Sequence, residues 1–336
     1  MASTSQRLGM VDALRGVAAL SVVWYHFTSG VDDALPMWLK MSGAEGRLGL
    51  FVFFVISGFI IPHALAAADF QLRDFGRFML KRVLRLDPPY AVVVLLCLGL
   101  LQFSGVRHEF SWKQFLAHFG YANAFLHYAW YNRVFWTLAI EFQWYLFAAL
   151  LFPSWRRIGG MGCWLWAGIF LSLAWALDIS TTALAYLPLF LLGLAVFWQR
   201  TGRLATKPML LLLVLAGAYC EWRLEPGAGL AGVAAAVLIF SGRDGARWLK
   251  TVGTLSYSLY LVHLPIGLPV LRALDSHTDG ALGLLFVRVT ALTVSLAVAW
   301  LLWRFVELPA MRWAARVPLK ARAVPISNSR PPVSRN

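Results

Sequence analysis

Arg15 and His26 are the first residues whose types and spacing could do chemistry, because both lie within a long apolar segment. A cation inside a membrane helix costs about 2.5 to 3.5 kcal/mol on insertion scales and usually faces a polar interior. Their separation corresponds to three helical turns plus about 20° and an axial rise of about 16 Å. We therefore expect both on one helix face, with His26 as a candidate general base. The alternatives are a topology anchor at Arg15, paired with Asp12, and a structural histidine with a satisfied hydrogen bond.

Arg82 and Arg85 lie three residues apart in the segment KRVLRLDPPY. On a helix this spacing directs both guanidinium groups toward one multivalent anion, and phosphate is a suitable ligand for such a pair. The alternative is ordinary cytoplasmic positive charge on a solvated helix face.

Glu141, in FWTLAIEFQWYLF, is an acidic residue placed deep in an apolar segment. An unpaired carboxylate there would be costly, so we expect Glu141 to be protonated or paired. Its predicted depth resembles that of His26, which permits a carboxylate that orients the imidazole. The alternative is a carboxyl group that serves helix packing by bonding to a neighbouring backbone or hydroxyl group.

Two further apolar stretches hold small or polar residues. In FFVISGFII, Ser57 and Gly58 lie among bulky side chains and predict close helix approach, a packing role that we favour over substrate contact. In SYSLYLVHLPI, Tyr257, Tyr260 and His263 recur at three-residue intervals and share a helix face. His263 is a second candidate for a polar cavity, with a position at the membrane interface as the alternative.

The composition indicates one integral membrane domain. Hydrophobic residues make up 60% of the 336 residues and charged residues 14%. The net charge of +14 does not indicate nucleic-acid binding, because the basic residues lie between apolar segments rather than on one soluble surface. No CxxC pair is present, so the three cysteines are assigned no redox or metal role, and no cleavage pattern of a signal peptide follows the first apolar segment.

Ten apolar segments of about 15 to 23 residues are predicted to span a membrane. They cover residues 11 to 27, 48 to 68, 87 to 103, 134 to 153, 161 to 177, 181 to 198, 208 to 221, 228 to 241, 252 to 271 and 281 to 304. With the amino terminus in the cytoplasm, the inside segments hold 21 Lys and Arg and the outside segments hold seven, while Arg15 and Arg288 lie within spans. This bias predicts that both termini are cytoplasmic.

Three segments outside the spans have predicted features of their own. Residues 69 to 87 are expected to form a basic, amphipathic cytoplasmic surface helix that ends where Pro88 and Pro89 begin the third span. In the outer segment 104 to 133, Trp112, Phe115 and Phe119 recur at helical spacing, so part of it is expected at the membrane interface, and the segment is long enough to cover a site. The basic tail, residues 316 to 336, is expected to be disordered and attracted to anionic lipid.

Taken in order, these motifs resemble acyltransferase family three, the integral membrane acyltransferases that include bacterial O-antigen and exopolysaccharide O-acetyltransferases. VDALRGVAALSVVWYHF resembles the family's first helix, FFVISGFII its second, and KRVLRLDPPY its Arg-x-x-Arg signature with the following proline and Tyr90. WTLAIEFQWYLF resembles its glutamate-bearing helix, SYSLYLVHLPI a late helix and RFVELP the end of the last one. Phe142 and Leu308 depart from the pattern, since the family often has a second acid and an arginine at those positions.

The resemblance implies an all-α acyltransferase in the bacterial cytoplasmic membrane, with residues 1 to 315 as the membrane domain. It implies acyl-CoA, most often acetyl-CoA, as a co-substrate from the cytoplasm, and a sugar, polysaccharide or glycoconjugate hydroxyl as the acceptor at the outer side. No tightly bound cofactor and no metal are expected, and the oligomeric state cannot be predicted.

The residues take their roles from this resemblance. His26 is the expected general base or the carrier of a transient acyl group, and Glu141 orients it. The expected donor-binding residues are Arg15, Arg82 and Arg85, and the supporting residues are Asp12, Ser57, Tyr90, Tyr257 and His263. The alternative from another class is a transporter or flippase whose intramembrane Arg, His and Glu line a substrate or proton path, although no internal repeat supports it.

Overall fold

The computed structural model describes residues 4–29, 35–103, 110–177 and 181–319, and every regular element in this part of the chain is a helix. The elements are α1 (Thr4–Thr28), α2 (Met37–Gly43), η1 (Ala44–Leu48), α3 (Gly49–Ala67), η2 (Leu72–Asp74), α4 (Phe75–Phe103), α5 (Trp112–Phe119), α6 (Phe135–Trp155), α7 (Gly160–Ala176), α8 (Leu187–Arg200), α9 (Thr206–Arg223), α10 (Ala228–Ser241), α11 (Arg247–Asp275), α12 (Ala281–Leu302), η3 (Trp303–Glu307) and α13 (Leu308–Ala315). The predicted all-α fold is confirmed, and each of the ten predicted spans coincides with a helix: α1, α3, α4 and α6 to α12.

Five helical stretches in the described residues are long and apolar enough to cross a membrane, judged by length and composition. They are Met37–Ala67, Leu72–Gln102, Phe135–Trp155, Arg247–Asp275 and Ala281–Ala315. Helices α7, α8 and α10 are apolar but shorter. The chain is therefore read as a multi-span membrane protein, while the number ten stays a prediction, because α1 and α7 to α10 do not meet the same standard of length and composition.

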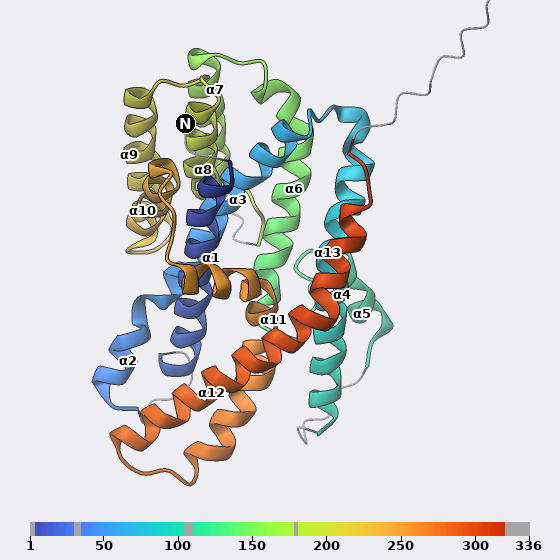
Figure 1. The fold of residues 1–336 in the computed structure, drawn as a ribbon, viewed down its shortest axis with the longest axis vertical. Coiled ribbons are helices and arrows are strands. Elements are labelled where there is room, and N and C mark those ends of the chain that lie inside the picture. The colour runs from blue at the N-terminus through green and yellow to red at the C-terminus, as the bar shows by residue number, and fades with distance from the viewer. Residues whose placement is uncertain (1–3, 30–34, 104–109, 178–180, 320–336) are drawn as a thin grey trace, which may run out of the picture.

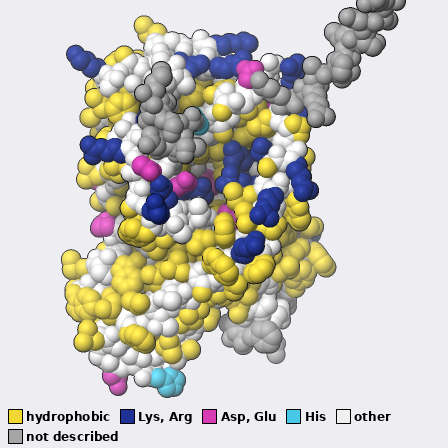
Figure 2. Space-filling model, viewed as in Figure 1, with side chains coloured by type: hydrophobic (Ala, Val, Ile, Leu, Met, Phe, Trp, Pro, Cys, Tyr) yellow, Lys and Arg dark blue, Asp and Glu magenta, His cyan; other side chains and the backbone are white. Residues whose placement is uncertain are grey.

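Polar contacts join the predicted inside loops to one another and the predicted outside loops to one another. After α3, Asp69 forms an ion pair with Arg156 at 2.7 Å, and Arg203 after α8 donates a hydrogen bond to the Arg156 carbonyl at 2.7 Å. At the other ends of α3 and α9, Arg47 of η1 forms an ion pair with Glu225, between α9 and α10, at 3.3 Å, while Figure 1 shows the course of these helices. This grouping agrees with the predicted alternation of the loops. Lys and Arg side chains gather in the upper and middle parts of the face in Figure 2, whereas its lower part is mostly hydrophobic.

The predicted separate surface helix before the third span is wrong. Helix α4 runs without interruption from Phe75 to Phe103 and contains Pro88 and Pro89 in its interior. Prolines inside a helix leave carbonyls one turn earlier without their helical donors, and neighbouring helices can compensate in a membrane. The carbonyls affected by Pro88 and Pro89 are those of Leu84 and Arg85. Tyr257 of α11 donates a hydrogen bond at 2.8 Å to the next carbonyl, that of Leu86, and so ties this part of α4 to α11.

The bounds of two other predicted spans differ in the structure, and one predicted helix is confirmed. The sixth span begins at Leu187 rather than at residue 181, and the last span continues through a π-helical turn, Trp303–Glu307, into α13. The predicted helix in the outer segment is confirmed as α5, whose Trp112 and Phe115 rings are in contact. Residues 320–336 of the predicted disordered tail lie outside the described residues.

Buried side chains form two hydrophobic cores. One comes mainly from α3 and α6 to α10, and the other mainly from α1, α4, α11 and α12, with α6 contributing to both. Helix α1 packs along α11, α11 against α12, and α3 against α8, and Figure 1 shows α12 crossing the molecule obliquely toward α13 and α4. Residues from both cores line a cavity between them.

The α3–α8 crossing depends on two glycines. A Cβ atom on Gly58 would lie 2.1 Å from the Phe190 carbonyl oxygen, and one on Gly193 would lie 2.0 Å from the Val55 carbonyl oxygen. The predicted packing role of Gly58 is therefore confirmed, because no larger side chain fits unless the backbones move apart. The close crossing also sets the position of the adjacent Ser57.

Candidate active site

A cavity of about 200 Å³ lies between the two cores, and we call it the central cavity. Its polar lining comes from α1, α3, α4, α6 and α11 and consists of Arg15, Ser57, Arg82, Arg85, Thr137, Glu141, Tyr145, Ser256, Tyr257 and Tyr260. The structure thus brings together the three arginines predicted to bind the donor. Glu141, Ser57 and Tyr257 lie with them.

A hydroxyl group contacts Arg15 and aromatic rings contact Arg82 in the central cavity. Arg15 Nε donates a hydrogen bond to Ser256 Oγ at 3.2 Å. The guanidinium carbon of Arg82 lies 5.1 Å from the centroid of the Phe78 ring and 5.3 Å from that of Tyr145. Among the described residues, no carboxylate forms an ion pair with Arg82 or Arg85. Three cations facing one lining carboxylate make the cavity suited to an anion such as phosphate.

Glu141 is paired, as expected, and its partners are hydroxyl groups. Ser57 Oγ donates to Oε1 in a short hydrogen bond, and Tyr145 Oη donates to Oε2 at 3.0 Å. Trp144 Nε1 also donates to the Ser57 carbonyl at 3.1 Å, which fixes α3 against α6. These bonds agree with the alternative in which Glu141 bonds to neighbouring hydroxyls.

His26 lines a second cavity of about 690 Å³, which we call the outer cavity. Its Nδ1 lies 3.0 Å from Nε2 of His263, a fully buried residue of α11. On the other side of its ring, His263 Nδ1 lies 2.8 Å from the Tyr260 carbonyl and 3.3 Å from the Leu259 carbonyl. The two predicted histidines therefore form a hydrogen-bonded pair between α1 and α11.

The carbonyl partners of His263 assign the protons of both rings. A carbonyl oxygen only accepts, so His263 Nδ1 carries a proton and Nε2 of the neutral ring accepts. His26 then donates from Nδ1, which leaves a lone pair on Nε2 of its neutral ring. A general base requires such a lone pair.

The similar predicted depth of His26 and Glu141 permitted a contact between them, and the described residues show none. They line different cavities, and each makes its hydrogen bonds to other partners. Two residues at similar depth need not face each other, because depth does not fix the rotation of either helix about its axis. The hydrogen-bond partner of His26 is His263 instead.

Two predicted supporting residues lie away from the lining of these cavities. Among the described residues, Asp12 forms no ion pair with Arg15, and it packs where α1 crosses Gly253 of α11. Tyr90 is fully buried, with its ring centroid 4.7 Å from that of Phe135.

The central and outer cavities adjoin at Leu50, Thr137 and Tyr260, which line both. Thr137 Oγ1 and Tyr260 Oη are 2.7 Å apart, so this hydroxyl pair lies at the junction. A third cavity of about 530 Å³, the inner cavity, shares Ala64, Arg82 and Arg85 with the central one and is also lined by Lys81. The three cavities therefore follow one another from the basic end of α4 to His26.

Glu307 lies near this site, although no role was predicted for it from the sequence. Its carboxylate is buried, accepts a hydrogen bond from Ser258 Oγ at 2.6 Å and lies within electrostatic range of Arg15 and Arg85. The π-helical turn Trp303–Glu307 carries this residue, and such turns often occur at functional sites. The signal in the sequence that could have indicated this residue was an acidic side chain directly after the last apolar segment.

In the described residues, no three His, Cys, Asp or Glu side chains lie close enough to hold a metal ion. The profile of the family described as acyltransferase domain matches residues 9–304. The chain belongs to acyltransferase family three. As a member of acyltransferase family three it is an enzyme with an acyl donor and an acceptor, which favours catalysis over the transporter alternative. No curated protein and no solved structure gives a significant match to the chain.

Proposed function

We propose that this family-three acyltransferase moves an acyl group, most often acetyl, from acyl-CoA to a hydroxyl of a sugar, polysaccharide or glycoconjugate. The observation that carries the proposal is the series of three cavities. Acyl-CoA has phosphates at one end and a thioester at the end of a long arm. A series of cavities that begins among arginines and ends at an imidazole matches that distribution of charge and reactivity.

The donor is proposed to bind with its phosphates at Arg82 and Arg85, which line both the inner and the central cavity, and at Arg15. Guanidinium groups suit phosphate because they form charge-assisted and bidentate hydrogen bonds. The pantetheine arm would pass the Thr137–Tyr260 hydroxyl pair toward His26. The axial rise of about 16 Å from Arg15 to His26 resembles the length of that arm.

The reaction is proposed to occur at His26 Nε2. Its lone pair takes the proton of the acceptor hydroxyl while the oxygen attacks the thioester carbonyl carbon. The carbon–sulfur bond breaks, and the imidazolium returns the proton to the departing thiolate, so the products are an ester and free CoA. His263 Nε2 keeps the His26 Nδ1 proton in place throughout. A transient acyl group on His26 Nε2 would use the same lone pair.

The acceptor is proposed to approach from the outside of a bacterial cytoplasmic membrane, in line with the predicted orientation. Mass spectrometry of the surface glycans of the producing bacterium tests this. Ester-linked acyl groups should disappear when the gene is removed and return with the wild-type gene. They should also return with the matched control His277→Ala, because His277 is exposed at the end of α11 and does not line the cavities. An unchanged glycan acylation pattern after gene removal would rule out this acceptor class.

A further inference from the structure

The outer cavity holds an unusual share of the positive charge predicted for the outer side. The predicted outside segments contain seven Lys and Arg, and three of them, Arg47, Arg133 and Arg223, line this one cavity. The positive-inside rule disfavours Lys and Arg in outer segments, so it does not explain why three of them line a single cavity. A role in binding would explain it. Glu225 is the one carboxylate in the described lining.

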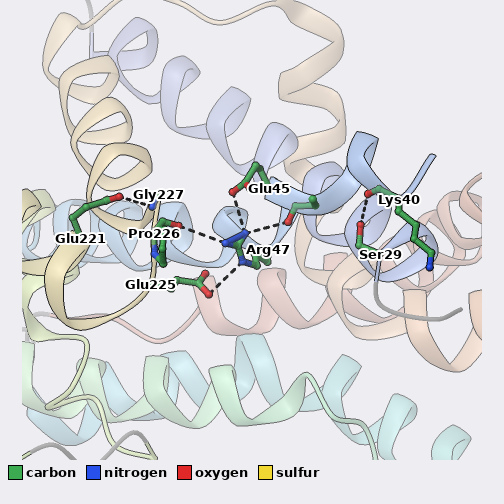
Figure 3. Close-up of polar contacts among 9 residues, drawn as sticks. Ser29, Lys40, Glu45, Arg47, Glu221, Glu225, Pro226 and Gly227 are labelled. Atoms are coloured by element: carbon green, nitrogen blue, oxygen red, sulfur yellow. Dashed lines mark hydrogen bonds and ion pairs between the residues drawn. The ribbon is translucent and has the colours of Figure 1, made fainter. Parts of the chain in front are cut away.

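The positive charge of Arg47 is paired with carboxylates in structural contacts. Its guanidinium group forms ion pairs with Glu45 at 3.0 Å and with Glu225 at 3.3 Å, and it also donates to the Ala44 carbonyl at 3.2 Å. Figure 3 shows Arg47 at the centre of these contacts, where it joins η1 to the loop between α9 and α10. Glu221 steadies the same loop by accepting from the Gly227 amide at 2.7 Å. The lining carboxylate is therefore already engaged by Arg47.

Arg133 and Arg223 are the remaining cations of the outer cavity. Arg133 is exposed, and among the described residues it forms no ion pair. It lies within electrostatic range of both His26 and His263. The guanidinium carbon of Arg223 lies 5.5 Å from the centroid of the Trp222 ring. A bound anion would offset the positive charge of Arg133, which otherwise opposes the positive charge that His26 gains as a base.

Aromatic side chains line the outer cavity together with the arginines. Tyr25, Trp136 and Tyr186 line the outer cavity, and the Trp136 and Tyr186 ring centroids are 5.9 Å apart. Such rings offer flat apolar faces with polar edges, and ligand sites commonly combine them with a few placed charges. A sugar ring bearing one negative group matches this combination.

We propose that the outer cavity selects acceptors that carry an anionic group, which Arg133 binds with Arg223 nearby, while a hydroxyl of the same sugar meets His26. The anion is a carboxylate, as in an acidic sugar, or a phosphate. This inference rests on the proposed function, because it assigns the acceptor class of the same site.

Equilibrium binding to the purified full-length protein in lipid nanodiscs, without donor, tests the inference. The probes are radiolabelled methyl glucuronide, methyl glucoside and glucose 6-phosphate. Binding of the glucuronide or the phosphate should be about tenfold tighter than that of the neutral glucoside, as expected for one charge-assisted contact. Arg133→Gln should remove that preference. The matched control Arg272→Gln should keep it, because Arg272 is exposed at the end of α11 and is not part of the cavity lining.

The outcomes separate this inference from the proposed function. A preference for the glucuronide, the phosphate or both that Arg133→Gln removes supports the inference and names the source of the anion. Equal binding of charged and neutral probes, including no binding of either, overturns it, as does a preference that survives Arg133→Gln. A parallel assay of CoA release from acetyl-CoA decides the proposed function, so a protein that prefers anionic probes but releases no CoA would overturn only the latter.

Discussion

At the scale of single residues, the proposed role of His26 as a base depends on a hydrogen-bond partner, His263, that accepts its Nδ1 proton. His263 Nδ1 is committed to backbone carbonyls at 2.8 and 3.3 Å, so only Nε2 is left to receive the His26 Nδ1 proton. The pair therefore leaves the His26 Nε2 lone pair available for the acceptor hydroxyl. His263 is a positioning residue in this account, because it acts through His26.

Replacing His263 tests that positioning role. We expect His263→Leu to lower kcat by about tenfold to a hundredfold, because His26 Nδ1 loses a buried partner worth about 1 to 3 kcal/mol. The KM for acyl-CoA should change little, since the proposed donor arginines lie in another cavity. His263→Gln should restore part of kcat, because its side-chain oxygen can reach the position of Nε2. Equal activity in the Leu variant and the wild type would contradict the role, as would a Gln variant no better than Leu.

Residue identity and spacing predicted the contents of the site better than its pairings. Arg15, Arg82 and Arg85 line one cavity, as their types suggested, because polar groups in apolar helices gather in a shared polar interior. The bond between His26 and His263, and that between Glu141 and Ser57, could not be predicted. Spacing fixes the face of one helix but not its rotation against another.

At the scale of elements, α4 carries Arg82 and Arg85 from the inner cavity into the central one. We expect the double variant Arg82→Ala with Arg85→Ala to raise the KM for acyl-CoA by about tenfold or more, because each lost charge-assisted contact is worth about 1.5 to 3 kcal/mol. Steady-state kinetics with varied acyl-CoA measures this, and kcat at saturating donor should change much less.

The control for α4 is Arg77→Ala on the same helix. Arg77 pairs with Asp74 at 3.7 Å and does not line the cavities. Its removal should leave the donor KM near the wild-type value. If Arg77→Ala raises the KM as much as the double variant does, the effect is one of general positive charge rather than of a phosphate site.

The outer segment, held by His118, should respond to pH. His118 is fully buried, its Nδ1 lies 2.8 Å from the Gln114 carbonyl, and its Nε2 accepts from the Tyr131 amide at 3.2 Å. Burial lowers the pKa of His118 below its ordinary value of about 6.5, so the folded segment favours the neutral ring. The stability of the segment is then present above about pH 6.5 and is lost as the pH falls toward the lowered pKa, because the unfolded segment binds the proton more readily.

Hydrogen exchange, corrected for the intrinsic effect of pH on exchange rates, measures this response. Protection of the Tyr131 amide should fall between about pH 7.5 and about pH 5 in the wild type. His118→Gln should show a smaller dependence, because glutamine does not titrate. Protection that stays constant over this range in the wild type would show that the ring is not the controlling group.

The existence of the helices was predicted well, because it depends on the length of the apolar segments. Their boundaries and irregular turns were predicted poorly, because these depend on packing between helices. All ten apolar segments form helices, because each must satisfy its backbone internally in lipid. The continuation of α4 through Pro88 and Pro89 was missed, since local proline rules favour a helix start and tertiary contacts overrule them. The π-helical turn that carries Glu307 had no signal in the sequence pattern.

At the scale of the whole molecule, the arrangement separates two chemical tasks. The cavities lie between helices of the two hydrophobic cores, and the cations proposed to bind phosphate and the candidate base line different cavities that meet at the Thr137–Tyr260 pair. The family and the multi-span fold could be predicted from motif order and apolar length. The separation of Glu141 from His26 could not, because it depends on how five helices pack together.

Acyl transfer by purified His26→Ala protein at saturating acyl-CoA is the most direct test of the central claim. Loss of a general base commonly reduces the rate by about 10² to 10⁴. We predict a fall in CoA release of that size, with acyl-CoA binding unchanged because the arginines of the central cavity are intact. CoA release at the wild-type rate by His26→Ala would contradict the assignment of His26 as the catalytic base.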